Sequence, residues 1–482
     1  MIRITMGYKL KRLGMGEVIK NIKVFNSKRM NYSDSRWLIA SACAALFWYV
    51  SLFPGRIGSD PIQAINFMEK NQSTDWWSAF YFWFLRITTF DGQSIWLASL
   101  LSIIPLYFSL IYFLYSFPEK KVRIDRVAFF ICLSPIFGNF AVNINHDVFF
   151  TSGIFLVLGF SLRIYLKKIK KIDKFVPYLS IVLFLTSKTG YVLIICLIIF
   201  IIIVYKNLLK TLSLILFSLI VFIVTSIGIT KTTVPMHYLP FLADIKCVAQ
   251  HAEARINENQ WEYLKQITPI ENWKKPTTCS SMDMAVGVLA VANYEVINAI
   301  EFAKNYSSIA TKNPAIVIQA HLQRSSIALP PPFFQGPQNQ VDRDINNPVG
   351  LNTNIALQLG PEVLHPSIDL PSLKLDINFL KPLESFALLG TFLVNQASWF
   401  WGWGGLWLWP IFVYLLFRLK ERNVLRLINL TYPILITHAV LIAVGPIPAP
   451  RYVMSTILVG NIILLFLLSE LFAKNKSKNE AL

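Results

Sequence analysis

Charged residues are scarce in this chain. Only 15% of its 482 residues are Asp, Glu, Lys or Arg, whereas 54% are hydrophobic and the mean hydropathy is +0.50. A soluble domain carries roughly 25% charged residues, so this composition excludes an ordinary soluble enzyme and is typical of an integral membrane protein. Apolar runs such as 191–205 and 460–472, extended by their flanks, reach the ~20 residues that a helix needs to cross a bilayer.

A cleavable leader pattern is also missing. The first 36 residues are polar and basic, and no small-residue cleavage site follows the first apolar segment. We therefore expect this segment to be retained as a signal anchor.

The net charge of +18 is unevenly distributed along the chain. Both ends and alternate connections between the predicted spans hold 28 of the 45 Lys and Arg residues but only 8 of the 27 Asp and Glu residues. This asymmetry is the positive-inside pattern of cytoplasmic loops, so it indicates topology, with both termini in the cytoplasm, and gives no support to nucleic-acid binding. The predicted spans are 37–54, 93–117, 127–143, 147–166, 175–188, 190–205, 211–230, 396–417, 427–446 and 452–472.

Familiar catalytic and cofactor motifs are absent from the sequence. It has no GxxxxGK[ST] loop, no serine-protease set and no internal repeat, and its six His residues are scattered without metal-ligand spacing. The predicted cytoplasmic loops are too short to bind ATP or a nucleotide sugar. We therefore expect the chemistry on the non-cytoplasmic face, with a substrate that is already there.

The expected fold is an all-α polytopic membrane protein with about ten transmembrane helices. A basic cytoplasmic N-terminus (1–36) precedes an N-terminal transmembrane module (37–230), whose first outer loop (55–92) carries an aromatic, amphipathic stretch at 75–90 that predicts an interfacial helix. A mainly helical outer segment (231–395) becomes Pro-rich and irregular over 326–382. The C-terminal helices (396–472) and a cytoplasmic tail (473–482) complete the chain.

The five cysteines divide by location. Three lie inside predicted spans, where a small buried hydrophobe is the usual role. Cys247 and Cys279 both fall in the outer segment. An oxidising compartment would allow these two to form a disulfide.

Acidic residues cluster just beyond span ends on the outer face, at Asp60, Asp75 and Asp147. Asp60 and Asp147 close different loops that both return to the membrane surface, so they can converge on one site. A partly desolvated carboxylate there can act as general base on a sugar hydroxyl. Each acid is equally compatible with a solvated loop or a helix cap, and the residues alone leave both alternatives open.

Two basic residues complement these acids. Lys188, in "LTSKTGYV", and Arg451, in "GPIPAPRYVM", occupy tight outer hairpins against the general trend of charge. Lys and Arg are natural phosphate ligands, although snorkelling or a salt bridge would also explain them. Acids that activate a hydroxyl, together with cations that hold a lipid phosphate, indicate transfer of a group from a phospholipid carrier.

In their order and sidedness these residues resemble the polytopic GT-C glycosyltransferases that use polyprenyl-phosphate sugars, especially the bacterial and prophage enzymes that modify O-antigen and convert serotype. Such proteins carry an essential Asp after the first span in a Gly/Ser-Asp setting, and "GRIGSDPIQAI" has Asp60 there. The element "DWWSAF" keeps Asp75 and Trp76 of an Asp-Trp-His-Pro-like pattern but has Trp77 and Ser78 in place of His and Pro.

Further matches lie at the heads of later spans. "HDVFF" keeps Asp147, with His146 where Lys is usual, and "SKTGY" and "PRYVM" supply Lys188 and Arg451. The resemblance extends from about residue 37 to 455.

The resemblance implies an inverting hexosyltransferase, with glucose a typical sugar, in the bacterial inner membrane with a periplasmic active site. Its donor would be an undecaprenyl-phosphate sugar and its acceptor a lipid-linked or lipopolysaccharide glycan, in contact with membrane lipids and without nucleic acid. Asp60 would be the general base, Asp147 and His146 would orient the acceptor or a metal, and Lys188 and Arg451 would hold the phosphate. A divalent cation, Mg²⁺ or Mn²⁺, stays open, and no other cofactor is implied.

Two other functions remain alternatives. An O-antigen polymerase or ligase is also polytopic with a large outer loop, but such enzymes usually rely on Arg-rich outer loops, and this segment has only Arg255, Arg324 and Arg343. A lipid-linked oligosaccharide flippase would predict ionisable residues in mid-span and often an internal repeat.

Overall fold

The computed structural model describes most of the apolar chain and part of the outer segment. The described residues are 32–53, 55–57, 61–62, 64–65, 67, 77–92, 94–117, 124–205, 208–226, 238–275, 279, 293, 296–329, 383, 385, 389, 403–418, 424–444 and 450–479.

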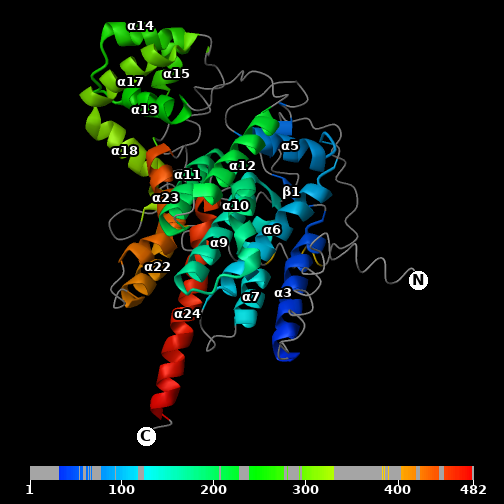
Figure 1. The fold of residues 1–482 in the computed structure, drawn as a ribbon. Coiled ribbons are helices and arrows are strands. Elements are labelled where there is room, and N and C mark those ends of the chain that lie inside the picture. Colours follow the sequence, from blue (N-terminus) through cyan, green and yellow to red (C-terminus); the bar gives the residue numbers. More distant parts are fainter. Residues whose placement is uncertain are drawn as a thin grey trace.

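The described part of the chain is mostly helical, as the fold class predicts (Figure 1). The first half contains α3 (Tyr32–Ser51), α5 (Ala79–Thr88), α6 (Trp96–Leu114), α7 (Ile124–Leu133), α8 (Pro135–Val142), α9 (His146–Tyr165), α10 (Val176–Phe184), α11 (Lys188–Tyr205) and α12 (Leu208–Ser226). The second half contains α13 (Leu239–Gln250), α14 (Glu258–Ile267), α15 (Ile270–Lys274), α17 (Ala299–Lys312), α18 (Pro314–Arg324), α22 (Gly404–Arg418), α23 (Val424–Val444) and α24 (Met454–Asn479). Short 3₁₀ turns are η1 (Lys171–Phe175), η4 (Ser326–Ala328) and η8 (Pro450–Val453).

Two of the described helices, α6 and α9, are long and apolar enough to cross a membrane, and the bent pair α7–α8 makes a third if it is one span. Six further apolar helices are shorter in their described parts. Each predicted span coincides with a helix or helix pair, but the structure does not confirm ten spans. The predicted span 175–188 in particular holds only the 9-residue α10, about 14 Å long at 1.5 Å per residue, which is half the thickness of a hydrocarbon core.

The predicted span 127–143 is broken, with α7 and α8 inclined by 66° at Ser134. The amide of Ile136 would be the i+4 donor to the carbonyl of Cys132, but it donates to Ser134 Oγ instead (3.2 Å). The carbonyl of Cys132 therefore accepts from Trp48 Nε1 of α3 (3.0 Å). Pro135 also interrupts the helix, because it has no N–H to donate. The indole thus satisfies the polar group that the break exposes inside the bundle.

Helix α9 is the centre of the bundle, and its residues from His146 to Leu162 are all buried. It packs against α6, α10, α23 and α24. Gly153 and Gly159 make these close approaches possible, because a Cβ at Gly153 would lie 2.6 Å from the ring of Phe184 and one at Gly159 would lie 2.8 Å from the ring of Tyr112. The residues at the two ends of α9 are therefore held by a tightly packed helix.

A two-residue parallel β-pair is the one departure from an all-helical fold among the described elements. Strand β1 (Arg56–Ile57) of the first outer loop pairs with β2 (Asn143–Ile144), which leads into α9, in the register Arg56↔Asn143 and Ile57↔Ile144. Gly55 enters this pair with φ of 123° and lies against Ser99, where a Cβ would approach to 2.4 Å. Only glycine fits both the backbone angle and the space.

The first outer loop has a small core of its own. Apolar side chains from α5, together with Ala64 and Phe67, pack with Ile144 of β2 and with residues near the start of α6 (Ile95 and Ala98). The aromatic helix predicted at 75–90 is present as α5, which begins after the N-cap Ser78. Its Trp83 indole donates to the carbonyl of Thr225 in α12 (2.9 Å), so α5 packs on the ends of other helices.

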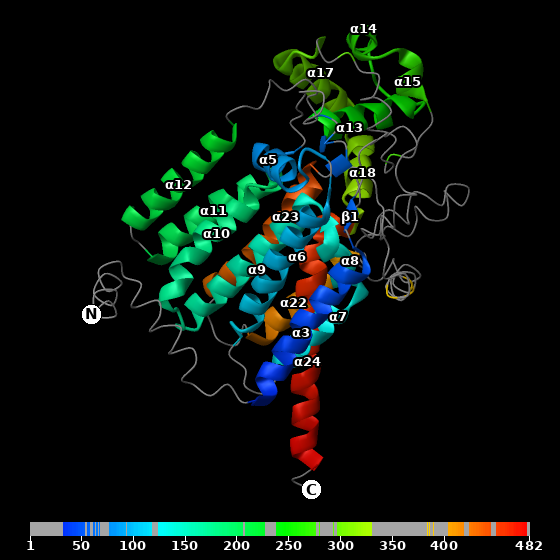
Figure 2. The same ribbon diagram turned by 90° about the vertical axis from the view of Figure 1, so that its right-hand side faces the viewer.

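The outer segment forms a separate helical group at one end of the molecule, opposite the end at which α24 terminates (Figures 1 and 2). Helices α13 to α18 share a core that includes Trp273 and Phe302. The predicted pairing of Cys247 with Cys279 is present as a disulfide, with Cα atoms 5.3 Å apart. Most of the Pro-rich stretch 326–382 lies outside the described residues.

The outer segment is joined to the apolar helices α22, α23 and α24 through η4. Trp403, just before α22, donates its indole N–H to the carbonyls of Ser326 and Leu329 (3.2 and 2.9 Å). His438 of α23 donates from Nδ1 to the carbonyl of Ala328 (2.7 Å), and its Nε2 lies 2.8 Å from Thr456 Oγ1 of α24.

Candidate functional site at the start of helix α9

The predicted site residues divide into those that the structure describes and those that it does not. Asp60 and Asp75 lie outside the described residues, and of Arg451 only the backbone, in η8, is described. His146, Asp147 and Lys188 are described in full, and they form the basis of the candidate site.

His146 and Asp147 open the buried helix α9. The side chain of Asn145 caps the helix by accepting a hydrogen bond from the amide of Asp147 (3.3 Å). His146 Nε2 lies 3.4 Å from Asp147 Oδ1, and the two side chains are only 11% and 6% exposed. The positive end of the helix dipole favours a carboxylate in this first turn, so the position suits a buried acid.

The ring of His146 keeps unused hydrogen-bonding capacity. Within the described part of the chain its Nδ1 is buried without a hydrogen-bond partner. A buried polar atom of this kind costs free energy unless a water, an ion or a substrate satisfies it. The start of α9 therefore offers an imidazole nitrogen to a bound group.

Helix α5 of the first outer loop forms one wall around this pair. The Tyr81 ring meets the His146 ring edge-on at 5.4 Å, and the Tyr81 hydroxyl donates to the carbonyl of Ile144 (3.3 Å). Phe84 packs edge-on against Phe149 at 4.7 Å. Sequence reasoning placed this helix at an interface but did not find that it packs directly on His146.

The turn between α10 and α11 also contacts the start of α9. Thr186 Oγ1 lies 3.5 Å from the carbonyl of His146, and Lys188, two residues on, begins α11 with an exposed side chain. Gly190 allows this turn to be tight, because a Cβ there would lie 1.9 Å from the carbonyl oxygen of Phe184. The Lys-x-Gly pattern thus has a steric cause, and it brings the Lys188 segment to the start of α9.

The flanks of Asp60 belong to the same region. Ile57, three residues before Asp60, pairs with Ile144, three residues before Asp147. Pro61 and Ile62, directly after it, are buried. The described neighbours of Asp60 therefore lie beside the segment that carries His146 and Asp147.

A second polar cluster, which sequence reasoning missed, lies in the outer segment. Asp244 of α13 is fully buried and accepts from Tyr306 (2.8 Å), lies 2.7 Å from His321 Nε2, and pairs with Arg324. Burial, and next the charge of Asp244, raise the pKa of Tyr306, so this phenol stays protonated. Three helices meet at this cluster, which is consistent with a structural role, and its members are too far apart in sequence to form a motif.

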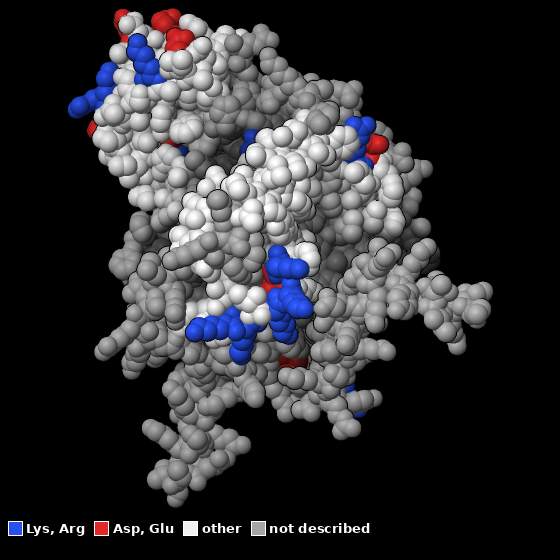
Figure 3. Space-filling model, viewed as in Figure 1, with Lys and Arg blue, Asp and Glu red and all other residues white. Residues whose placement is uncertain are grey.

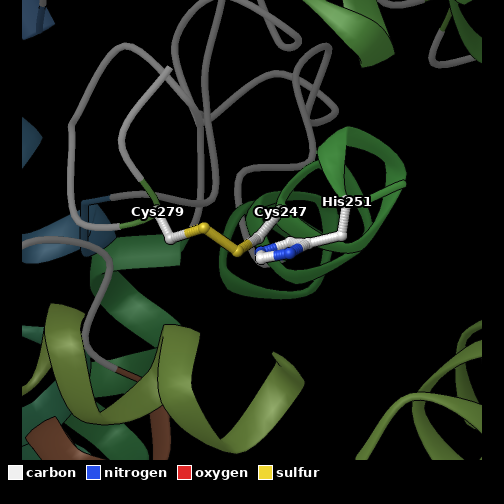
Figure 4. A group of neighbouring side chains, drawn as sticks. All are labelled: Cys247, His251 and Cys279. Carbon is white, nitrogen blue, oxygen red and sulfur yellow. A yellow bond between two sulfur atoms is a disulfide. The ribbon is translucent and has the colours of Figure 1, made fainter. Parts of the chain in front are cut away.

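Cys247, His251 and Cys279 also lie together, with their donor atoms within 4.8 Å of one another (Figure 4). Figure 4 shows the two cysteines joined through sulfur. Disulfide sulfurs are not thiolates, so this group does not match the ligand set of a zinc site.

Comparisons with known proteins found no relative: the chain matches no protein-family model, no curated protein and no solved structure.

Proposed function

We propose that this protein is a membrane glycosyltransferase that moves a hexose from an undecaprenyl-phosphate carrier to a hydroxyl of a surface polysaccharide. The observation that carries the proposal is the register of β1 with β2. It sets the chain that leads to Asp60 beside the chain that leads to Asp147. Asp60 and Asp147, which are far apart in the sequence, each come three residues after a member of the paired residues Ile57 and Ile144.

The proposed chemistry is a single displacement. The acceptor oxygen attacks the anomeric carbon while the bond from that carbon to the lipid phosphate oxygen breaks. Asp60 takes the hydroxyl proton, and undecaprenyl phosphate leaves with the bonding electron pair. Attack opposite the leaving group inverts the anomeric configuration.

We assign the other site residues to binding and orientation of the substrates, with Asp60 as the base. Asp147 and His146 are buried and rigidly held at the start of α9, so they suit orientation of the acceptor. Lys188 lies on the turn that contacts His146, and we assign it, with Arg451, to the phosphate. Asp75, next to the segment that packs on α9, is assigned to the substrate.

The described residues supply one nitrogen donor for a divalent cation, Nδ1 of His146, and a nitrogen ligand suits Mn²⁺ better than Mg²⁺, which prefers oxygen. Asp147 Oδ1 lies against the other ring nitrogen, Nε2, so the two side chains do not chelate one ion in this arrangement. Such a cation would neutralise charge on the donor phosphate. Loss of activity with EDTA and its recovery with Mn²⁺ would establish the requirement.

We place the enzyme in a bacterial inner membrane, with both termini cytoplasmic and the site periplasmic. The support for this placement is the concentration of Lys and Arg in one set of loops, together with the apolar helices of the bundle.

The test is mass spectrometry of surface polysaccharide from cells that express wild type or Asp60→Asn. We expect a side-branch hexose with wild type and its loss with the variant, because a general base contributes roughly 10²- to 10⁴-fold. Asp91→Asn is the matched control, since Asp91 lies in the same loop but is 66% exposed and paired with Arg86. Decoration that persists in a normally inserted Asp60→Asn protein would refute the assignment, and longer chains without a new sugar would indicate a polymerase instead.

A further inference from the structure

The connection between α9 and α10 is an unusual surface loop with the sequence "LKKIKKIDKF" (166–175), which we call the lysine loop. Its five lysines are all exposed. Three apolar side chains between them are exposed as well, Ile169 at 44%, Ile172 at 68% and Phe175 at 61%. Large apolar side chains interleaved with lysines are typical of segments that lie in the headgroup region of a membrane.

The single acid of the loop does not neutralise these lysines. Asp173 is fully buried and accepts from Arg163 Nη1 (2.9 Å), the Tyr112 hydroxyl (3.1 Å) and the amide of Lys170 (2.6 Å). Arg163 is fixed in turn by Ser116 Oγ (2.9 Å) and lies over the Tyr112 ring at 4.2 Å. The charge of Asp173 is therefore balanced by Arg163, so this buried acid is not available to neutralise the five exposed lysines.

These contacts also give the loop a defined shape. Asp173 and Arg163 hold η1 against the ends of α6 and α9, so the lysines are displayed from a fixed turn. Figure 3 shows the resulting group of Lys and Arg side chains, in blue, on the face that Figure 1 presents and remote from the outer segment.

The position of the loop selects its partner. It begins at the last residues of α9, one of the helices long and apolar enough to cross a membrane, so it lies where that helix would leave the hydrocarbon. A second copy of this chain would bring five lysines against five lysines, which is unfavourable. A leaflet surface with anionic phosphates complements the charge, and its headgroup layer accepts the exposed apolar side chains.

We propose that the lysine loop binds the phosphate headgroups of anionic phospholipids and so fixes the end of α9 in the membrane. This binding is independent of any sugar transfer. It has a structural consequence for the site nonetheless, because a helix anchored at Tyr165 sets the depth of His146 at its other end, about 30 Å away at 1.5 Å per residue.

The experiment is native mass spectrometry of the full-length protein released from nanodiscs that contain equal amounts of phosphatidylglycerol and phosphatidylcholine. We expect wild type to retain phosphatidylglycerol preferentially. Replacing all five loop lysines by Gln lowers the ratio of retained phosphatidylglycerol to phosphatidylcholine roughly tenfold. A matched control replaces five exposed lysines of the outer segment by Gln and leaves the ratio unchanged (Lys265, Lys274, Lys275, Lys304 and Lys312).

A second measurement needs no variant. Raising the salt from about 0.05 M to about 0.5 M before release shortens the Debye length severalfold. We therefore expect wild type to retain less phosphatidylglycerol at the higher salt concentration. Equal retention of the two lipids by wild type, or no change in the loop variant, would overturn the proposal. A dimer that disappears in the loop variant while lipid retention is unchanged would overturn it in favour of a contact between copies.

Discussion

Two buried acids lie at the two ends of α9, Asp147 in its first turn and Asp173 of η1 beside its last turn, and they differ in how their hydrogen bonds are satisfied. At the C-terminal end, Asp173 accepts hydrogen bonds from three partners, and its ion pair with Arg163 is 2.9 Å long. At the N-terminal end, the contact of Asp147 with His146 is 3.4 Å long, and Nδ1 of His146 has no hydrogen-bond partner in the described structure. One helix thus joins a fully satisfied polar cluster to one with spare capacity.

This difference in hydrogen bonding indicates different roles for the two clusters. A buried polar network in which each group is satisfied makes the fold rigid, whereas a partly satisfied one costs free energy that a ligand can recover. The Asp173 cluster is therefore a clamp on the fold, whereas the His146–Asp147 pair is the position that we propose for binding. The clamp stabilises the helix bundle that carries this pair and takes no direct part in binding.

The largest effect should come from breaking the clamp. Asp173→Asn leaves Arg163 buried without its counter-charge, and we expect the free energy of unfolding to fall by about 3–5 kcal/mol. Denaturant titration of the purified protein measures it. Sugar transfer per folded molecule should change little, and a variant as stable as wild type would contradict the clamp.

Asp147→Asn should have the opposite profile. The amide keeps the shape of the side chain but removes its charge, so we expect turnover to fall roughly 10²-fold while the free energy of unfolding changes by less than about 1 kcal/mol. Initial rates and denaturant titration on one preparation separate the two effects. Lost stability with unchanged turnover would make Asp147 a structural residue.

The smallest effect should come from an exposed ion pair whose N–O distance equals that of Arg163 and Asp173. Arg86 and Asp91 are 2.9 Å apart, but their side chains are 55% and 66% exposed. Water screens this pair, so Asp91→Asn should cost at most about 1 kcal/mol and should not affect transfer. A loss as large as that of Asp173→Asn would show that burial does not explain the strength of the clamp.

Apolar length and periodicity predicted where helices occur, and each predicted span contains one. The sequence did not reveal the bend at Ser134, because a break in a membrane helix is tolerated where other groups satisfy the freed carbonyls. Here the amide of Ser134 serves the carbonyl of Ile131, and Trp48 from a distant helix serves that of Cys132. The short α10 was missed for a similar reason: its apolar run extends into a turn whose tightness depends on Gly190.

The candidate site was predictable only in part. Charge sidedness singled out Asp147 and Lys188, since charges near span ends are informative in an apolar chain, and the family resemblance added His146. The β1–β2 pair has two residues per strand and no sequence pattern, and the packing of Tyr81 on His146 joins residues 65 positions apart. Such non-local contacts depend on the fold as a whole.

Sugar transfer by the purified protein is the most direct test of the account. Wild type in nanodiscs receives an undecaprenyl-phosphate hexose and an acceptor glycan, and both released undecaprenyl phosphate and glycan mass are measured. We predict one hexose added for each lipid phosphate released, and no turnover above background with Asp60→Asn. Wild-type protein that releases no lipid phosphate under conditions where it is folded, or that joins whole glycans without adding a single hexose, would contradict the proposed function.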